Sequence, residues 1–323
     1  MLLPWLTRQL SRKQPATFFD THAWHQDLII IPTYKQTNQI AHDDMLGIWW
    51  NEHHKETTLR LTHLRAIIDK LTTTQEVRSV TFEGGNPLMW TELDQALFYL
   101  HKKKIRSGIK TDGTLPLGKS TPGTILVNLR PYLLDPTLTA SITQNITQYA
   151  TQKARVSLLW PIHAHDTIDM ALCAVTLAKR CGLPLIAHPA LLIREIIRPD
   201  TTAQVRASTA LQATWQTIQA VLQTTGYNQL RLGALTPSIF PEDASFSDHP
   251  CRSCSFARAT IQPDGATVSH CLALPYSVNI HTGLTLTDIH EKHFAEKIEQ
   301  LEKKVTHTPR PQNCLAYQAF MVP

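Results

Sequence analysis

Several features of membrane and secreted proteins are missing from this sequence of 323 residues. No apolar run approaches the roughly 18 to 20 residues that a membrane-spanning helix needs. The opening segment, MLLPWLTRQLSRKQ, places apolar residues before basic ones, which reverses the charge order of a secretory signal, and it lacks a clear cleavage site. We therefore predict no membrane segment and a cytoplasmic location.

The chain also lacks a long block of like charge. Its 31 basic and 26 acidic residues give a formal net charge of +5, and the tight basic runs at 102–104 and 303–304 have the character of solvated helix ends. A nucleic-acid-binding protein more often gathers its basic residues on one face. We expect no nucleic-acid partner.

Seven short strand-like runs alternate with segments whose apolar residues recur every three or four positions, as in amphipathic helices. The predicted strands are 28–33, 77–82, 105–110, 123–130, 155–161, 183–187 and 229–232. The predicted helices contain 61–71, 93–100, 138–149, 168–175 and 211–222. This alternation predicts an α/β fold, a partial or full barrel with a parallel sheet, in which ligands bind at the carboxyl ends of the strands.

The alternation ends near residue 235, where proline, serine, aspartate and cysteine become frequent. We predict an N-terminal extension (1–26), an α/β domain (27–235) and a small C-terminal module (236–323) that contains one charged helix, 287–305.

Four of the six cysteines fall in the C-terminal module: Cys251, Cys254, Cys271 and Cys314. The first two form a CxxC pair, and a turn at 264–265 predicts a hairpin that returns the third cysteine to this pair. Four thiolates suit zinc or an iron–sulfur cluster, and we predict that these four share one metal centre. A disulfide, which a cytoplasmic location disfavours, or buried free thiols are the alternatives.

The remaining cysteines, Cys173 and Cys181, are eight residues apart on one predicted helix. They are therefore separated by about 12 Å along its axis and are poorly placed to bond to each other. We expect them to pack in the core.

Two polar glycine turns follow neighbouring predicted strands, one at 83–87 (EGGNP) and one at 110–114 (KTDGT). Consecutive glycines let a ligand come close to the backbone at a strand end. Asn128 and Arg130 end a further strand and suit a ligand carboxylate or phosphate, with an ordinary polar strand end as the alternative. The candidate cofactor-binding residues are Gly84, Gly85, Asn86, Pro87, Thr111, Asp112, Gly113 and Asn128.

At these turns the sequence resembles the radical S-adenosylmethionine (SAM) family, specifically members with a C-terminal SPASM or twitch extension. EGGNP stands where that family has GGEP, the turn that contacts the methionyl amino group, and TDGT stands where it commonly has TNGT. CRSCSFARATIQPDGATVSHCLA is similar to the family's auxiliary-cluster segment. The resemblance implies a partial (β/α) barrel of the radical SAM type with a SPASM/twitch-like module, SAM at the two turns and an auxiliary 4Fe-4S cluster at the four C-terminal cysteines.

The sequence departs from this family in the loop after the first strand. There the family places three cysteines, as CxxxCxxC, to hold the cluster that reduces SAM, whereas residues 33–44 contain no cysteine and the first cysteine of the chain is Cys173. Asn86 also replaces the glutamate of GGEP, which removes a carboxylate. We predict that standard radical SAM catalysis is absent.

Histidines offer another way to hold a metal near this loop. The candidates are His22, His25, His42, His53 and His54, with Asp43, Asp44 and Glu52. Imidazole and carboxylate are suitable metal ligands, but the spacing matches no strong signature, and ordinary surface loops are the alternative. His163 and His165 follow another strand and have the same two interpretations, a ligand-facing position or a simple loop.

The leading hypothesis is a binding or maturation partner that keeps the barrel and the auxiliary cluster without the SAM-cleaving cluster. Since SPASM proteins often modify ribosomally made peptides, the resemblance implies a peptide, a cofactor precursor or an active maturation enzyme as its partner. One alternative is an enzyme with repurposed chemistry that uses SAM, a histidine-held metal or cluster redox cycling. Another is a structural zinc protein whose four cysteines only hold the tail in place.

Overall fold

The computed structural model describes residues 27–37, 57–74, 77–152, 154–189 and 201–232, with short pieces at 260–261, 263 and 268–269. The predicted N-terminal extension, the four C-terminal cysteines and the predicted helix 287–305 lie outside the described residues. None of the described helices is both long and apolar enough to cross a membrane.

A parallel sheet forms the centre of the described fold. Its strands in chain order are β1 (Asp27–Ile30), β2 (Ser79–Phe82), β3 (Arg106–Thr111), β4 (Thr124–Asn128), β5 (Arg155–Ile162), β6 (Leu185–Pro189) and β7 (Leu230–Leu232). All seven predicted strands are confirmed. Several are nearly continuous apolar runs, as expected of parallel strands that are covered on both faces.

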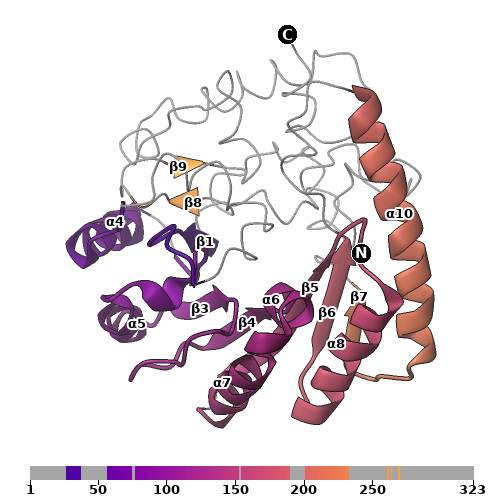
Figure 1. Ribbon diagram of the computed structural model, residues 1–323. Coiled ribbons are helices and arrows are strands. Elements are labelled where there is room, and N and C mark those ends of the chain that lie inside the picture. Colours follow the sequence, from indigo (N-terminus) through magenta and orange to yellow (C-terminus); the bar gives the residue numbers. More distant parts are fainter. Residues whose placement is uncertain are drawn as a thin grey trace, which may run out of the picture.

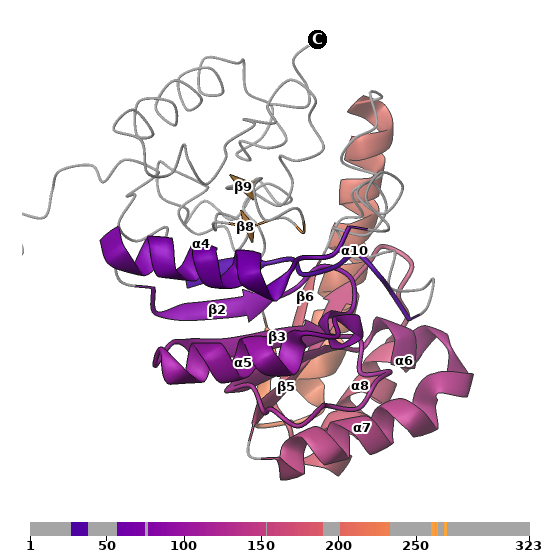
Figure 2. The same cartoon turned by 90° about the vertical axis from the view of Figure 1, so that its left-hand side faces the viewer.

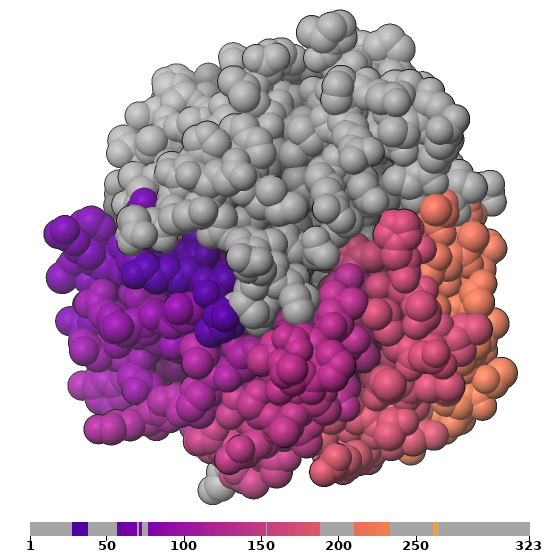
Figure 3. All heavy atoms as spheres, in the orientation of Figure 1, coloured from indigo at the N-terminus to yellow at the C-terminus, as the bar shows by residue number. Residues whose placement is uncertain are grey.

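The strands follow one another in the sheet in the same order as in the chain, from β1 to β7. Right-handed crossovers in a constant direction place every connecting helix on the same side of the sheet. Figure 1 shows this arrangement, with the helices fanned around the outside of a curved sheet. In Figure 3 the successive parts of the described chain lie side by side, from indigo to orange. The sheet is open, which confirms the partial barrel.

Five longer helices connect the strands: α4 (Leu61–Thr74), α5 (Leu93–Lys102), α7 (Thr139–Thr151), α8 (Ile168–Cys181) and α10 (Thr201–Thr224). Short helical turns are η2 (Pro87–Met89), α6 (Arg130–Leu134) and η3 (Pro136–Leu138). Figure 2 shows α4 and α5 side by side beside β2. The predicted core positions of α4, such as Leu64 and Leu71, are fully buried.

Two of the apolar residues that recur at helical spacing in α8 are not buried. Ile168 and Leu172 are 44% and 47% exposed, and the buried residues include Ala171, Ala174 and Ala178. The helix packs partly through these small side chains, which let it come close to its neighbours. Val175 and Leu177 are buried as well, whereas Ile168 and Leu172 lie on the outer side.

The two cysteines of α8 share that helix as predicted, but their packing differs. Cys173 is exposed, so the expectation that it packs in the core is wrong. Cys181 is half-buried against the core, and burial raises the pKa of its thiol. The predicted core role therefore holds only for Cys181.

The predicted hairpin between Cys254 and Cys271 is confirmed at its two strands, β8 (Thr260–Ile261) and β9 (Val268–Ser269), which pair in antiparallel fashion. β8 also pairs in parallel with β1, with Ile29 opposite Thr260. The sheet therefore continues beyond β1 into the segment that follows residue 235.

Candidate functional site

The carboxyl ends of β1, β2 and β3 bring three turns together. Residues 31–37 follow β1, residues 83–87 follow β2, and residues 112–114 follow β3. Because β1 pairs in parallel with β2 and β2 with β3, the three turns share one edge of the sheet. The two predicted glycine turns are thus adjacent, and Asn128 lies one strand further, at the end of β4.

Both glycines of the first turn are required by the close approach of the segment after β1. Gly84 has a φ of 109°, and a Cβ there would overlap with Cγ2 of Ile31. A Cβ on Gly85 would overlap with the carbonyl oxygen of Lys35, and the Gly85 amide donates to the carbonyl of Thr33 at 3.0 Å. The approach that these glycines permit is therefore made by the chain's own backbone.

The Asn86 side chain is bonded on both of its polar atoms. Its Nδ2 donates to Oδ1 of Asp112 at 2.7 Å, and its Oδ1 accepts from the Leu88 amide and from Oγ1 of Thr111, each at 3.1 Å. Its backbone amide donates to the carbonyl of Lys35 at 2.7 Å. Asn86 is 2% exposed, and its side chain joins the two turns and caps the amino end of η2.

Asp112 is the centre of these bonds. Besides Asn86, its Oδ1 accepts from the amide and the hydroxyl of Thr114 at 3.0 and 2.6 Å, and its Oδ2 accepts from the hydroxyl of Thr37 at 2.6 Å. We call Thr37, Asn86, Thr111, Asp112 and Thr114 the carboxyl-edge network. It ties together the three turns that follow β1, β2 and β3.

The other predicted residues of this edge also have internal roles. Pro87 is buried and begins η2. Gly113 has a φ of 76°, and its carbonyl accepts from Nδ2 of Asn145 at 2.8 Å. Oδ1 of Asn128 accepts from the amide of Arg130 at 3.0 Å. The structure brings the predicted residues of the two turns together, and contact with a cofactor remains a prediction.

Replacing Asn86 with aspartate is expected to destabilise the protein by about 2–3 kcal/mol at neutral pH. A second carboxylate would then face Asp112 in a buried site, and repulsion with desolvation would raise the pKa of the introduced carboxyl. Because the pKa of this carboxyl is higher in the folded than in the unfolded protein, the full loss of stability is present above the folded-state pKa. The loss becomes smaller as the pH falls toward about 4, the pKa of an aspartate in an unfolded chain.

Denaturant unfolding between pH 4 and 8 measures this effect. Asn86→Ala is the control because it removes the same bonds without adding charge, so its deficit should change little with pH. Equal pH dependence of the two variants would contradict the expected carboxylate pair.

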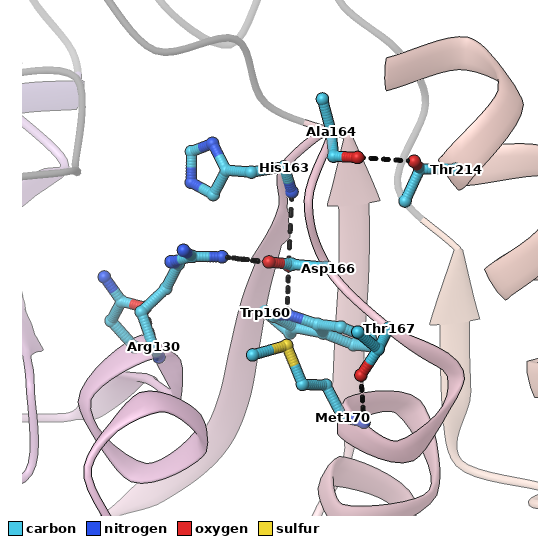
Figure 4. Close-up of polar contacts among 9 residues, drawn as sticks. Arg130, Trp160, His163, Ala164, Asp166, Thr167, Met170 and Thr214 are labelled. Carbon is cyan, nitrogen blue, oxygen red and sulfur yellow. Dashed lines mark hydrogen bonds and ion pairs between the residues drawn. The ribbon is translucent and has the colours of Figure 1, made fainter. Parts of the chain in front are cut away.

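A second buried polar cluster lies at the ends of β4 and β5 (Figure 4). Nη1 of Arg130 contacts both oxygens of Asp166, at 2.6 and 2.9 Å, with side chains only 8% and 2% exposed. Oδ2 of Asp166 also accepts from Nε1 of Trp160 at 3.0 Å and from the amide of His163 at 3.2 Å. The sequence left open whether Arg130 meets a ligand carboxylate or phosphate or simply ends a polar strand; in the structure the chain's own Asp166 supplies a carboxylate.

The structure places His163 in this cluster, buried to 3% exposure. The Asp166 amide donates to the His163 carbonyl at 3.1 Å, which closes a tight turn at the end of β5. Sequence reasoning missed Asp166, although its place after two histidines at a strand end was a usable signal. It also missed Thr37.

Most of the predicted metal ligands, unlike the residues of the two glycine turns, are not among the described residues. The four C-terminal cysteines, and the group from His22 to His54 with its acidic neighbours, lie outside the described residues. Within the described ranges, no three histidine, cysteine, aspartate or glutamate side chains are grouped to hold a metal ion. The residues 31–37 that follow β1 offer hydroxyl, phenol, amide and ammonium groups and no thiolate, so they do not fit an iron–sulfur cluster.

Comparison with solved structures identifies proteins that have a similar fold. The sequence matches no protein-family model and no curated protein significantly. Streptococcus suis SuiB bound to S-adenosylmethionine is 14% identical, with a TM-score of 0.57 over 85% of this chain and 67% of that chain. SuiB bound to precursor peptide SuiA is 13% identical, with a TM-score of 0.58 over 84% of this chain and 66% of that chain. This chain thus spans about two thirds of the length of SuiB.

A second similar structure is native anSMEcpe with bound AdoMet and Cp18Cys peptide. It is 13% identical, with a TM-score of 0.53 over 91% of this chain and 95% of that chain. SuiB and anSMEcpe are radical SAM enzymes. At this level of sequence identity, the similarity is evidence for a shared fold and not for a shared function. This chain has the α/β fold of the radical SAM enzymes.

Proposed function

We propose that this chain is a binding or maturation partner in the modification of a peptide or cofactor precursor. It uses the radical SAM fold without cleaving SAM and carries one auxiliary iron–sulfur cluster at Cys251, Cys254, Cys271 and Cys314. Peptide recognition is supported by two proteins of similar fold, whose structures contain precursor peptide SuiA and Cp18Cys peptide.

The observation that carries this proposal is the carboxyl-edge network. In this chain, Thr37 of the segment after β1 is hydrogen-bonded to Asp112 and Thr114. That segment contains no cysteine, and neither does any position before Cys173. Thiolates are the usual ligands of an iron–sulfur cluster, so this edge lacks what a SAM-cleaving cluster needs.

The glycine turn also lacks the carboxylate with which a GGEP turn could meet the methionyl ammonium of SAM. The amides of Gly85 and Asn86 already donate to Thr33 and Lys35, and the Asn86 side chain is bonded on both polar atoms. Backbone carbonyls are the groups left for an ammonium. The proposed function therefore includes no step that depends on bound SAM.

The hairpin supports a shared centre for the C-terminal cysteines. Thr260 of β8 pairs with Ser269 of β9, so the start of one arm lies beside the end of the other. Cys254 precedes the first arm and Cys271 follows the second. When bound, such a cluster supplies electron transfer or structural cross-linking, and the cysteines hold it as thiolates.

Metal analysis tests the proposed cluster. Protein purified without oxygen should contain about four irons and four sulfides per chain. Cys251→Ala with Cys254→Ala should abolish both, whereas the matched control, Cys173→Ala with Cys181→Ala, should retain them. Zinc without iron would contradict the proposal and favour the alternative of a structural zinc protein. Absence of any metal would contradict the proposed cluster.

Calorimetry with SAM tests the alternative of a repurposed enzyme. We expect no heat of binding for SAM, because Asn86 supplies no carboxylate for the methionyl ammonium and its side chain is already hydrogen-bonded within the protein. Saturable binding that Gly84→Ala abolishes would favour the alternative.

A further inference from the structure

The outer surface of α8 and α10 exposes apolar and uncharged residues where a surface helix normally carries charge. Two of the large apolar side chains that are exposed in the described part of the chain lie one turn apart on α8. They are Ile168 and Leu172, at 44% and 47% exposure. On α10, no residue from 210 to 224 is charged. Since charged residues are depleted at the centres of protein interfaces, this pair of helices has the composition of an interface.

Two hydrogen bonds show how α8 and α10 lie against each other. The hydroxyl of Thr214 on α10 donates to the carbonyl of Ala164, just before α8, at 2.7 Å. Nζ of Lys179, in the last turn of α8, donates to the carbonyl of Thr225, just after α10, at 3.0 Å. The two helices therefore run side by side in the same direction, as Figure 1 shows.

The side of α8 that faces α10 carries the exposed apolar residues. Residues four, seven and eleven positions apart share one face of a helix, so Ile168, Leu172 and Lys179 lie on the same face. Because Lys179 reaches α10, the two apolar side chains lie on the α10 side of α8. The exposed residues of α10 that share a face with one another are small: Ala213, Thr217 and Ala220. A row of large side chains on α8 thus lies beside a row of small ones on α10.

Hydroxyl groups on this surface are already bonded within their own helices. Oγ1 of Thr176 donates to the carbonyl of Leu172 at 2.7 Å, and Oγ1 of Thr217 donates to the carbonyl of Ala213 at 3.0 Å. The large cost of burying a polar group arises when its donor is left unsatisfied. These two threonines can therefore be covered by a partner without that cost.

The charges on the exposed side of α8 are separated toward its two ends. Asp169 lies in the first turn, whereas Lys179 and Arg180 lie in the last, about 15 Å further along the helix. Between them, the exposed side chains of Leu172 and Thr176 are uncharged. A surface that is negative at one end, positive at the other and apolar between is complementary to itself after a rotation of 180°.

We propose that this outer face of α8 and α10 is a docking surface for a second copy of this chain. A two-fold axis near the middle of α8 packs this helix antiparallel against α8 of the second copy. The axis sets Asp169 opposite Lys179 of the second copy, and Leu172 opposite Thr176 of the second copy. A partner of another sequence does not require a face whose charges complement themselves. The inference does not rest on the proposed function, because these residues are outside the carboxyl-edge network and the C-terminal cysteines.

The size of this face sets the expected strength of the dimer. With α8 about 21 Å long and neighbouring helices about 10 Å apart, the face has an outline on the order of 400 Å². A standard interface buries roughly 800 Å² on each partner. We therefore expect a weak dimer with a dissociation constant in the micromolar range.

Sedimentation of the full-length protein between about 1 and 200 μM tests the proposal. The average mass should rise from monomer toward dimer with concentration. Leu172→Glu sets like charges from both copies near the axis and should raise the dissociation constant at least about tenfold. Phe98→Glu is the matched control, because Phe98 is 55% exposed on α5, away from this face. It should change the dissociation constant less than about twofold.

Exchange of the end charges tests the antiparallel arrangement. Asp169→Lys alone sets cations opposite each other at two places in the dimer and should weaken it at least about threefold. Asp169→Lys with Lys179→Asp should restore the affinity of the wild type, although both changes oppose the dipole of α8. Thr176→Glu, opposite Leu172, is a second variant at the centre and should also weaken the dimer, and circular dichroism checks that each variant is folded.

Three results would overturn the proposal. The wild type would remain monomeric at every concentration, or folded Leu172→Glu and Thr176→Glu would dimerise like Phe98→Glu, which places the contact elsewhere. In the third, the double charge exchange would be as weak as Asp169→Lys alone.

Discussion

Replacing Asp166 with asparagine is expected to lower the free energy of unfolding by about 3–5 kcal/mol. The substitution preserves the shape of the side chain but removes the negative charge that faces Arg130 at 2.6 and 2.9 Å. With both side chains almost fully buried, water cannot replace the lost partner. The guanidinium then loses the carboxylate that faces it in a buried site, which is the reason for the large effect.

Urea unfolding followed by circular dichroism measures this loss. Asp169→Asn is the control, because that carboxylate lies in the exposed first turn of α8 and should contribute only about 0.3–1 kcal/mol. Adding Arg130→Met to Asp166→Asn should cost less than the sum of the two single substitutions. A loss at Asp166 no larger than at Asp169 would show that the buried pair is not formed.

Gly85→Ala is expected to destabilise the protein by about 3 kcal/mol or more. A Cβ at this position would overlap with backbone atoms of Tyr34 and Lys35, which cannot rotate away as a side chain would. Relief requires the segment after β1 to move, and this would break the bonds from the amides of Gly85 and Asn86 to Thr33 and Lys35. We therefore expect local opening of this edge as well as lower stability.

Hydrogen exchange separates this steric effect from a general glycine effect. Gly182→Ala is the control: Gly182 has a φ of 63° but open space around its Cβ position, so alanine should cost only about 1 kcal/mol. Exchange at the amides of Gly85 and Asn86 should accelerate in Gly85→Ala and not in Gly182→Ala. Unchanged exchange in both variants would contradict the close packing of the two turns.

The fold could be predicted from the sequence because the patterns that indicate its strands and helices are local. Each strand is a short apolar run, and each helix such as α4 has apolar residues at a helical spacing, which neighbouring residues alone determine. The sequence pattern alone could not predict which face of α8 is buried. Its alanines and its larger residues, Ile168 and Leu172, both recur at helical spacing, and only the packed structure shows which set is inside.

The candidate site was predictable in part for a related reason. The glycine turns follow strands whose order could be inferred, so their meeting at one edge was expected. Bonds across that edge depend on residues far apart in the chain: Thr37 and Asp112 are 75 positions apart, and Arg130 and Asp166 are 36 apart. The join of β8 to β1 is another long-range pairing that local patterns do not indicate.

We propose that this chain keeps the radical SAM fold without cleaving SAM. The most direct measurement is the methionine released from SAM by the anaerobically purified, metal-loaded protein in the presence of a strong low-potential reductant. We predict release no greater than that of a matched sample without protein. Protein-dependent release of methionine, at one equivalent per chain or more, would contradict the proposed function.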